Sequence, residues 1–412
     1  TNTAVGAFSL DANTTGYNNA AVGKDALTDN TTGHSNVGLG TSALANNTSA
    51  ANNSAVGHGA MFDNTTGTNN AALGYLALAN NTTANNNTAI GASSLLANTT
   101  GSDNVSVGQG SLQSNTTGAS NTAIGRDSMV ANTTASHNVA VGKESITTNT
   151  TGEQNTALGN FSLALNTTAS SNTAIGYAAL QRNTTGDFNT ALGYAALDAC
   201  TTGTTNVGIG TNGLGSVTTG SQNVGVGLNA GGSITTGSNH LLLGYNSGNS
   251  GSPGGAITTG NNEVTIGNGD HSKINVQVSL TVASDERDKT DFTDLDVGLD
   301  FVNQLAPVTY KWDKRARYVD WDANPDTDLN SITHDGTHKE SWLDVGFKAQ
   351  SVEAVEASFG YNLSNETNLT TSLSQDGKQY GLQYEKFVPI LVKAVQELSA
   401  KVEELESKLN GE

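Results

Sequence analysis

Aromatic residues, cysteine and positive charge are all scarce in this sequence. Aromatic residues make up 5% and hydrophobic residues 35% of the 412 positions, and there is one cysteine. So little apolar volume excludes the thick core of an ordinary globular enzyme. One cysteine excludes an internal disulfide. The net charge of −19, without a basic cluster, argues against a nucleic-acid partner. No apolar run approaches the roughly 20 residues of a membrane span, so we expect no membrane insertion.

What the sequence has instead is a repeat. A glycine recurs every 17 residues from Gly6 to Gly244, and one more follows at Gly267 after a six-residue insertion. An aliphatic residue precedes each glycine, and a second apolar position, such as Leu27, follows four residues later. An Asn-Thr-Thr-Gly or Asn-Thr-Thr-Ala corner completes the unit. This pattern predicts a β-solenoid in residues 1–270 whose coils each contain a strand, a bend, a short strand and a corner. We expect one or two aliphatic residues per coil to face inward.

Several other features of the repeats have simple explanations. The Asn-Thr-Thr triplets match the N-glycosylation acceptor pattern, but the corner requirement explains them fully. Cys200 stands where most coils have Asn, and we interpret it as a buried or neutral substitution. The scattered histidines share no position in the repeat, so the sequence predicts no metal site and no cofactor.

The composition changes after the last coil. Alternating aliphatic residues from Ile274 to Val282 predict a strand that forms a neck over residues 271–283. Residues 284–412 are rich in charge and predict a small α+β domain. Within it we expect a polar insertion arm at residues 315–341, between two strands, and a long helix at residues 384–410.

The C-terminal helix carries an apolar seam with alternating spacings of three and four, which is typical of a coiled coil. Val and Leu in these registers would favour a dimer on their own, and the seam is also compatible with a helix that packs on its own domain. The seam residues that we expect in a trimeric coiled coil are Leu391, Val395, Leu398, Val402, Leu405 and Leu409.

Four short motifs carry a resemblance to a known family. They are Ser284-Asp285-x-Arg287-x-Lys289, Leu305-x-Pro307-Val308-x-Tyr310-x-Trp312, Gly346-Phe347-x-Ala349-Gln350 and the segment from Tyr384 to Leu398. In this order they resemble the intramolecular chaperone auto-processing domain of phage tailspikes, tail fibres and endosialidases. The upstream repeats are similar to the β-rolls of trimeric adhesin heads and to repeats of phage tail fibres.

The resemblance implies that residues 284–412 assemble a homotrimer, fold the upstream fibre and then cut the chain between Ala283 and Ser284. Ser284 and Lys289 would be the catalytic pair, supported by Asp285 and Arg287, although the residues alone would also suit a helix cap and surface charges. The chemistry is a serine attack on the preceding carbonyl, and a partly desolvated Lys289 can supply the base. A spacing of five requires a turn or a neighbouring subunit to bring the pair together. Asp288 departs from the family, which commonly has an apolar residue there.

These features together predict a structural fibre protein, with self-cleavage as its single-turnover reaction. The resemblance implies a phage tail fibre that is assembled in the host cytoplasm and acts extracellularly. Its other partners would be virion tail proteins and a host-surface receptor, either a glycan or a protein. A bacterial trimeric adhesin-like fibre with the same module is one alternative. A polysaccharide-degrading tailspike is the other, but the repeats offer no unique pair of carboxylates.

Overall fold

The computed structural model describes residues 1–271, 273–275, 277, 282–320, 324 and 327–411. Two compact units make up the chain. The first comprises Thr1–Ser247 and Thr258–Ile266, and the second comprises Gly248–Ile257 and Gly267–Glu412. The segment Gly248–Ile257 therefore interrupts the first unit in sequence but packs within the second.

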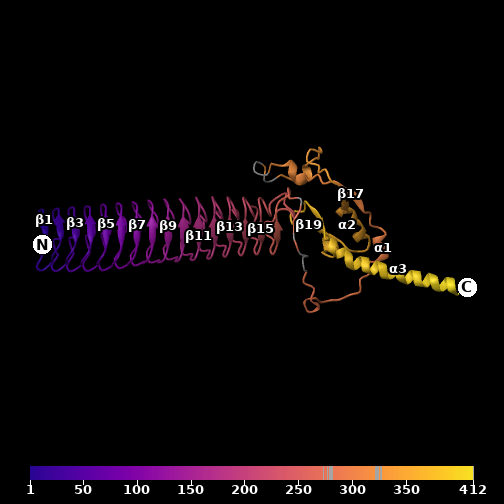
Figure 1. Cartoon of the computed structure of the whole chain (residues 1–412), viewed down its shortest axis with the longest axis horizontal. Coiled ribbons are helices and arrows are strands. Elements are labelled where there is room, and N and C mark those ends of the chain that lie inside the picture. Colours follow the sequence, from indigo (N-terminus) through magenta and orange to yellow (C-terminus); the bar gives the residue numbers. More distant parts are fainter. Residues whose placement is uncertain (272, 276, 278–281, 321–323, 325–326, 412) are drawn as a thin grey trace. The chain divides into compact units, whose positions relative to one another are not determined.

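The first unit is a β-solenoid in which the strand of each coil stacks on the strand of the next (Figure 1). Ala20 pairs with Val37, 17 positions later, whereas the last pair, Leu241 and Val264, is 23 positions apart because of the insertion. The predicted mainly β solenoid with 17-residue coils is confirmed. Within the described residues, sixteen strands form one parallel sheet in chain order: β1 (Thr3–Val5), β2 (Ala20–Val22), β3 (Val37–Leu39), β4 (Ser54–Val56), β5 (Ala71–Leu73), β6 (Thr88–Ile90), β7 (Val105–Val107), β8 (Thr122–Ile124), β9 (Val139–Val141), β10 (Thr156–Leu158), β11 (Thr173–Ile175), β12 (Thr190–Leu192), β13 (Val207–Ile209), β14 (Val224–Val226), β15 (Leu241–Leu243) and β16 (Val264–Ile266).

The second strand that we predicted in each coil is wrong, because the structure has a turn there. Leu27 and Met61 occupy the second apolar position with φ values of 52° and 50°, in the left-handed region. This backbone reverses the chain within a few residues, at a cost of about 1–2 kcal/mol per residue. The turn is held by bonds between coils, such as the Leu27 N–H donating to the Ala43 carbonyl at 3.0 Å. Full burial of the Leu27 side chain offsets the strain.

The expected inward-facing aliphatic residue of each coil is the turn residue, such as Leu27, and not the aliphatic residues at the ends of the strand. In β2 the middle residue, Ala21, is fully buried, whereas Val22 is 37% exposed. The buried turn leucines leave little room at the middle strand position: a Cβ added at Gly225 in β14 would lie 2.7 Å from Cγ of Leu214. The larger residues on either side consequently point outward. We call them the aliphatic stripe, and its most exposed members are Val5, Val22, Val37, Leu39, Leu73, Ile90, Ile124, Leu158, Leu192, Leu241, Val264 and Ile266.

Two columns of buried asparagines run through the coils and bond to the backbone. In the first column, Asn19 Oδ1 accepts from the Asn36 N–H at 2.9 Å, and Asn19 Nδ2 donates to the Gly33 carbonyl at 2.8 Å. In the second column, Asn47 Nδ2 donates to Asn30 Oδ1 at 2.7 Å. These amides satisfy buried backbone groups at the corners, which a thin coil cannot expose to water.

The second unit contains short elements around a small apolar core. They are the 3₁₀ turns η1 (Glu286–Asp288), η2 (Arg315–Tyr318), η3 (Leu329–Ser331), η4 (Leu363–Asn365) and η5 (Tyr384–Lys386), the helices α1 (Leu299–Val302), α2 (Ala349–Ser358) and α3 (Phe387–Asn410), and the antiparallel pairs β17 (Val308–Tyr310) with β18 (Asp344–Gly346) and β19 (Thr371–Leu373) with β20 (Tyr380–Leu382). The core consists of Val297, Phe301, Val352, Phe387 and Ile390. The predicted α+β character is confirmed.

The predicted neck and arm are described only in part. Ile274 and Val282 lie outside regular secondary structure, and Val276, Val278 and Leu280 lie outside the described residues. The arm at residues 315–341 contains η2 and η3, and its residues 321–323 and 325–326 also lie outside the described residues. The predicted domain limits at residues 270, 271 and 283 stay predictions.

Candidate active site

The predicted catalytic motif forms a single 3₁₀ turn. Asp285 caps η1, because its Oδ1 accepts from the Arg287 N–H at 2.9 Å. The Lys289 N–H closes the turn by donating to the Glu286 carbonyl at 3.1 Å. Asp is well suited to this place, since a short carboxylate can reach the first free N–H groups of a helical turn.

The turn brings Ser284 and Lys289 together within one chain. Lys289 Nζ lies 2.6 Å from Ser284 Oγ and 3.4 Å from the Ser284 carbonyl oxygen. The spacing of five required either a turn or a neighbouring subunit to bring the pair together, and the structure contains the turn. A lysine amine in its neutral form, at this distance, can accept the hydroxyl proton of the serine.

Asp285 and Arg287 form an ion pair beside the catalytic pair. Arg287 Nη2 lies 2.6 Å from Asp285 Oδ2, and Arg287 Nε lies 3.0 Å from Oδ1. The hydrogen bonds from Arg287 lower the pKa of the Asp285 carboxyl. Asp285 therefore stays ionised and keeps its cap on the turn over a wide pH range.

The whole motif is exposed to water in the single chain. Every residue from Val282 to Thr290 is exposed, Ala283 among them. The partial desolvation that we expected for Lys289 is therefore not met by the described part of this chain. The motif is exposed because it lies in the sequence before the residues that form the apolar core, the first of which is Val297.

The C-terminal helix presents two different faces. Phe387, Ile390 and Ala394 are buried against the domain, and the Glu397 carboxylate accepts from the Leu299 N–H at 2.8 Å. The predicted seam does not belong to this packed face, since all of its residues are 45–78% exposed. These are Leu391, Val395, Leu398, Val402, Leu405 and Leu409.

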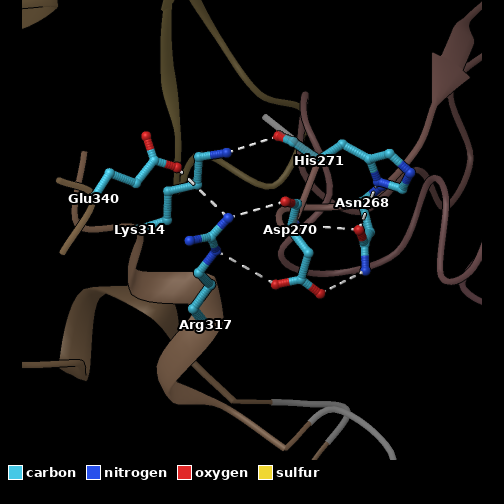
Figure 2. A network of polar contacts seen from close by, with 6 residues as sticks. All are labelled: Asn268, Asp270, His271, Lys314, Arg317 and Glu340. Atoms are coloured by element: carbon cyan, nitrogen blue, oxygen red, sulfur yellow. Dashed lines mark hydrogen bonds and ion pairs between the residues drawn. The ribbon is translucent and has the colours of Figure 1, made fainter. Parts of the chain in front are cut away.

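The sequence did not predict a polar network within the second unit. Asn268, Asp270 and His271 meet Lys314, Arg317 and Glu340, as Figure 2 shows. The two groups are more than 40 positions apart and follow no period. Only the density of charge beyond residue 284 hinted at it.

Among the described residues, no group of three or more His, Cys, Asp or Glu side chains is placed to hold a metal ion. No described helix combines the length and the apolar character that crossing a bilayer requires.

Comparison with known families identifies the C-terminal region. Residues 284–361 match the family described as chaperone of endosialidase, and the match begins at Ser284. The predicted resemblance is thereby confirmed for this region. Domains of this family act in trimer assembly, which supports a role in trimerisation and folding. Searches of curated proteins and of solved structures give no match.

Proposed function

We propose that this chain, which joins a β-solenoid to a chaperone-of-endosialidase domain, is a homotrimeric fibre protein that assembles through residues 284–412 and then cleaves itself before Ser284. The observation that carries the proposal is the coincidence of three features at one residue. The family match starts at Ser284, the solenoid lies entirely upstream of it, and Lys289 Nζ is within 2.6 Å of its hydroxyl.

The aliphatic stripe supports the trimer. Val, Leu and Ile side chains repeat in every coil and face outward, with Leu39 and Leu73 about half exposed. A continuous apolar stripe of this length is unusual on a monomer and marks an interaction surface. Its spacing equals that of the coils, so the surface that fits it best is the same stripe of another copy of this chain. The exposed seam of α3 extends the same argument to the C-terminal helix.

The cleavage chemistry uses groups of the motif only. Lys289 Nζ takes the proton of Ser284 Oγ, and Oγ attacks the Ala283 carbonyl carbon through a five-membered ring. The C–N bond breaks as the amide nitrogen gains a proton, which leaves an ester between Ala283 and the Ser284 side chain. Water then hydrolyses the ester, and the products are an Ala283 carboxylate and a Ser284 with a free amino group.

The exposure of the motif supports a coupling between assembly and cleavage. Lys289 is most effective as a base when its neutral form is favoured, and burial has that effect on an amine. A single chain leaves Lys289 in water. We infer that neighbouring chains cover the motif in the trimer, so that an unassembled chain is cut slowly.

The repeat explains why such a fibre needs a chaperone. If one chain slides by 17 residues against its partners, nearly every stripe contact is restored. The register is thus almost degenerate. A globular domain without repeats sets one alignment, and the solenoid can fold away from it. Removal of the domain leaves a fibre that is trapped kinetically.

The tail location and host attachment follow from the resemblance to phage tail fibres and tailspikes. We propose that the fibre acts outside the cell and contacts a host-surface glycan or protein. Labelling of virions with an antibody against residues 1–283 would test this location. Label on the capsid alone, or on no virion, would contradict it.

Mass spectrometry of the expressed chain tests the self-cleavage. We expect two fragments that meet at Ala283 and Ser284 in the wild type, and one intact chain for Ser284→Ala. Lys289→Met should reduce the rate at least 100-fold, because it removes the base. Arg182→Ala, which changes a solenoid surface pair, is the control and should cleave normally. Cleavage of Ser284→Ala at the same bond would refute the mechanism.

A further inference from the structure

Two segments upstream of the proposed cut pack against residues downstream of it. Gly248–Ile257 and the residues after Gly267 belong to the same compact unit as the C-terminal domain. The contacts between the two sides are direct and polar. We call them the latch, formed by Ser252, Ala256, Asp270 and His271 on the upstream side and Lys314, Arg317, Glu340, Asp376 and Gln379 on the downstream side.

The first half of the latch is a pair of cations bound to the chain after the last coil (Figure 2). Lys314 Nζ donates to the His271 carbonyl at 2.8 Å, and Arg317 Nη2 donates to the Asp270 carbonyl at 3.0 Å. Arg317 Nε also lies 3.6 Å from the Asp270 carboxylate. Charged donors make the stronger kind of hydrogen bond, and their acceptors here are mainly backbone oxygens.

Both partners of Arg317 are held in place. On one side, the Glu340 carboxylate lies 3.6 Å from Nη2, and its side chain is only 4% exposed. On the other, Asn268 Nδ2 donates to Asp270 Oδ2 at 3.0 Å, and Asn268 Oδ1 lies 2.9 Å from Nδ1 of His271. Arg317 thus links a buried carboxylate of the arm to a fixed loop after the solenoid.

The second half of the latch uses the insertion in the last coil. Gln379 Nε2 donates to the Ser252 carbonyl at 3.2 Å, and the Ala256 N–H donates to Asp376 Oδ2 at 3.2 Å. The loop fits closely, since a Cβ at Gly255 would lie 2.5 Å from Asp376 Oδ1. The extra residues of this coil therefore provide a binding surface that the other coils lack.

We propose that the latch keeps the C-terminal fragment bound to the fibre after cleavage, so that cutting the chain and releasing the chaperone are separate events. The proposal rests on the proposed function for the position of the cut. The cut at Ala283 breaks none of the latch contacts. In a trimer three latches act together. When one of them opens, the other two keep its partners close, so that it re-forms readily. Release then requires a condition that weakens the latch.

Salt is one such condition. Asp270 is 64% exposed and Arg317 is 22% exposed at their side chains, so this ion pair is screened by salt. The screening length falls from about 10 Å at 0.1 M to about 3 Å at 1 M salt. We expect retention at low salt and partial release at high salt.

Affinity capture of the self-cleaved full-length protein tests the latch. With a tag at the C-terminus, capture at 0.1 M salt should recover residues 1–283 in equal amount to residues 284–412. Lys314→Ala combined with Gln379→Ala removes two donors to carbonyls and should lower this recovery at least fivefold. Arg126→Ala, which disrupts a solenoid ion pair, is the matched control and should leave recovery unchanged. The extent of cleavage reports that each variant still folds.

Full separation of the wild-type fragments at 0.1 M salt would overturn the proposal, as would unchanged recovery for the double variant. A second protein separates this result from a failure of self-cleavage. In Ser284→Ala, a specific protease site inserted between Val282 and Ala283 allows the chain to be cut at will. Recovery of both fragments together after that cut supports the latch even if the wild type does not cleave itself. Their separation overturns the latch alone.

Discussion

At the scale of single residues, the asparagine columns hold neighbouring coils together by hydrogen bonds, whereas a thick apolar core stabilises most other proteins. Each buried amide accepts from one coil and donates to a corner of another, as Asn104 does with Asn121 and Gly118. His240 takes the same place in the last coils: Glu263 N–H donates to its Nδ1 at 3.2 Å, and Nε2 lies 2.7 Å from the Gly260 carbonyl. The imidazole reproduces both bonds of the amide in its Nε2–H tautomer.

Removal of one column amide should destabilise the solenoid. Asn104→Ala leaves the Asn121 N–H and the Gly118 carbonyl buried without their partner, at a cost of about 3 kcal/mol. We expect a lower thermal unfolding midpoint in circular dichroism. Asn80→Ala changes an exposed asparagine outside the columns and should alter stability by less than about 0.5 kcal/mol. Equal midpoints for the two variants would contradict this role of the columns.

Cys200 provides a probe of the folded solenoid. It occupies the second asparagine column, where it leaves Asn183 Oδ1 without a hydrogen-bond partner among the described residues. Burial raises the pKa of the Cys200 thiol to about 11. Of the two interpretations that the sequence allowed, a buried or a neutral substitution, burial is the one that the structure contains, because the position is fixed by the repeat. The mimicry by His240 was not predicted, since one histidine in a column carries no periodic signal.

Thiol labelling at pH 8 should therefore be blocked in the native protein. Only about one Cys200 thiol in a thousand is ionised at that pH, and the side chain is fully buried. One label per chain should appear once denaturant unfolds the coils. The raised pKa also means that stability falls as the pH rises above 9, where the unfolded chain ionises first. Rapid labelling in native buffer would show that the coil around Cys200 opens readily.

At the scale of elements, the repeat predicted the strand but not its orientation. Alternation identifies two faces of a strand, and both faces of a three-residue strand such as β8 carry apolar residues. Ala123 is buried and Ile124 is 39% exposed, which reverses the usual preference for burying the larger side chain. The left-handed backbone conformation of Leu27 in the turn was also not predictable from the sequence, because Leu rarely adopts that conformation.

Charge placed on the aliphatic stripe should prevent assembly. Ile90→Asp, Val107→Asp and Ile124→Asp together put three carboxylates in consecutive strands of the stripe. We expect loss of the trimer in analytical ultracentrifugation, because these charges would be buried between chains. The matched control is Thr83→Asp, Thr100→Asp and Thr117→Asp, which has the same spacing on exposed corners. A stable trimer in the stripe variant would show that the chains associate elsewhere.

At the scale of the whole molecule, the chaperone domain should be needed before the cut and dispensable after it. A chain without residues 284–412 should be aggregated or monomeric in size-exclusion chromatography. The same residues 1–283, produced by cleavage of the full chain, should remain a soluble trimer. A soluble trimer from the truncated gene would contradict the chaperone role.

The candidate site was predictable in part at this scale. The motif identified Ser284 and Lys289, but their approach depends on the 3₁₀ turn that Asp285 caps, which spacing alone does not specify. The latch was not predictable, because Arg317 and Asp270 are distant in sequence and belong to segments without a repeat. Unique contacts of this kind leave no pattern in one sequence.

The bonds between coils also determine how the rod responds to tension. They run from each coil to the next, so a pull along the solenoid crosses every boundary in series, and the weakest boundary yields first. The second asparagine column ends at Asn183, and its place is then taken by Cys200, Val217, Ile234 and Ile257. The coils beyond Asn183 therefore lack the amide-to-amide hydrogen bonds of this column. Mechanical failure should begin at this end of the rod, which leaves the longer asparagine-bonded part intact.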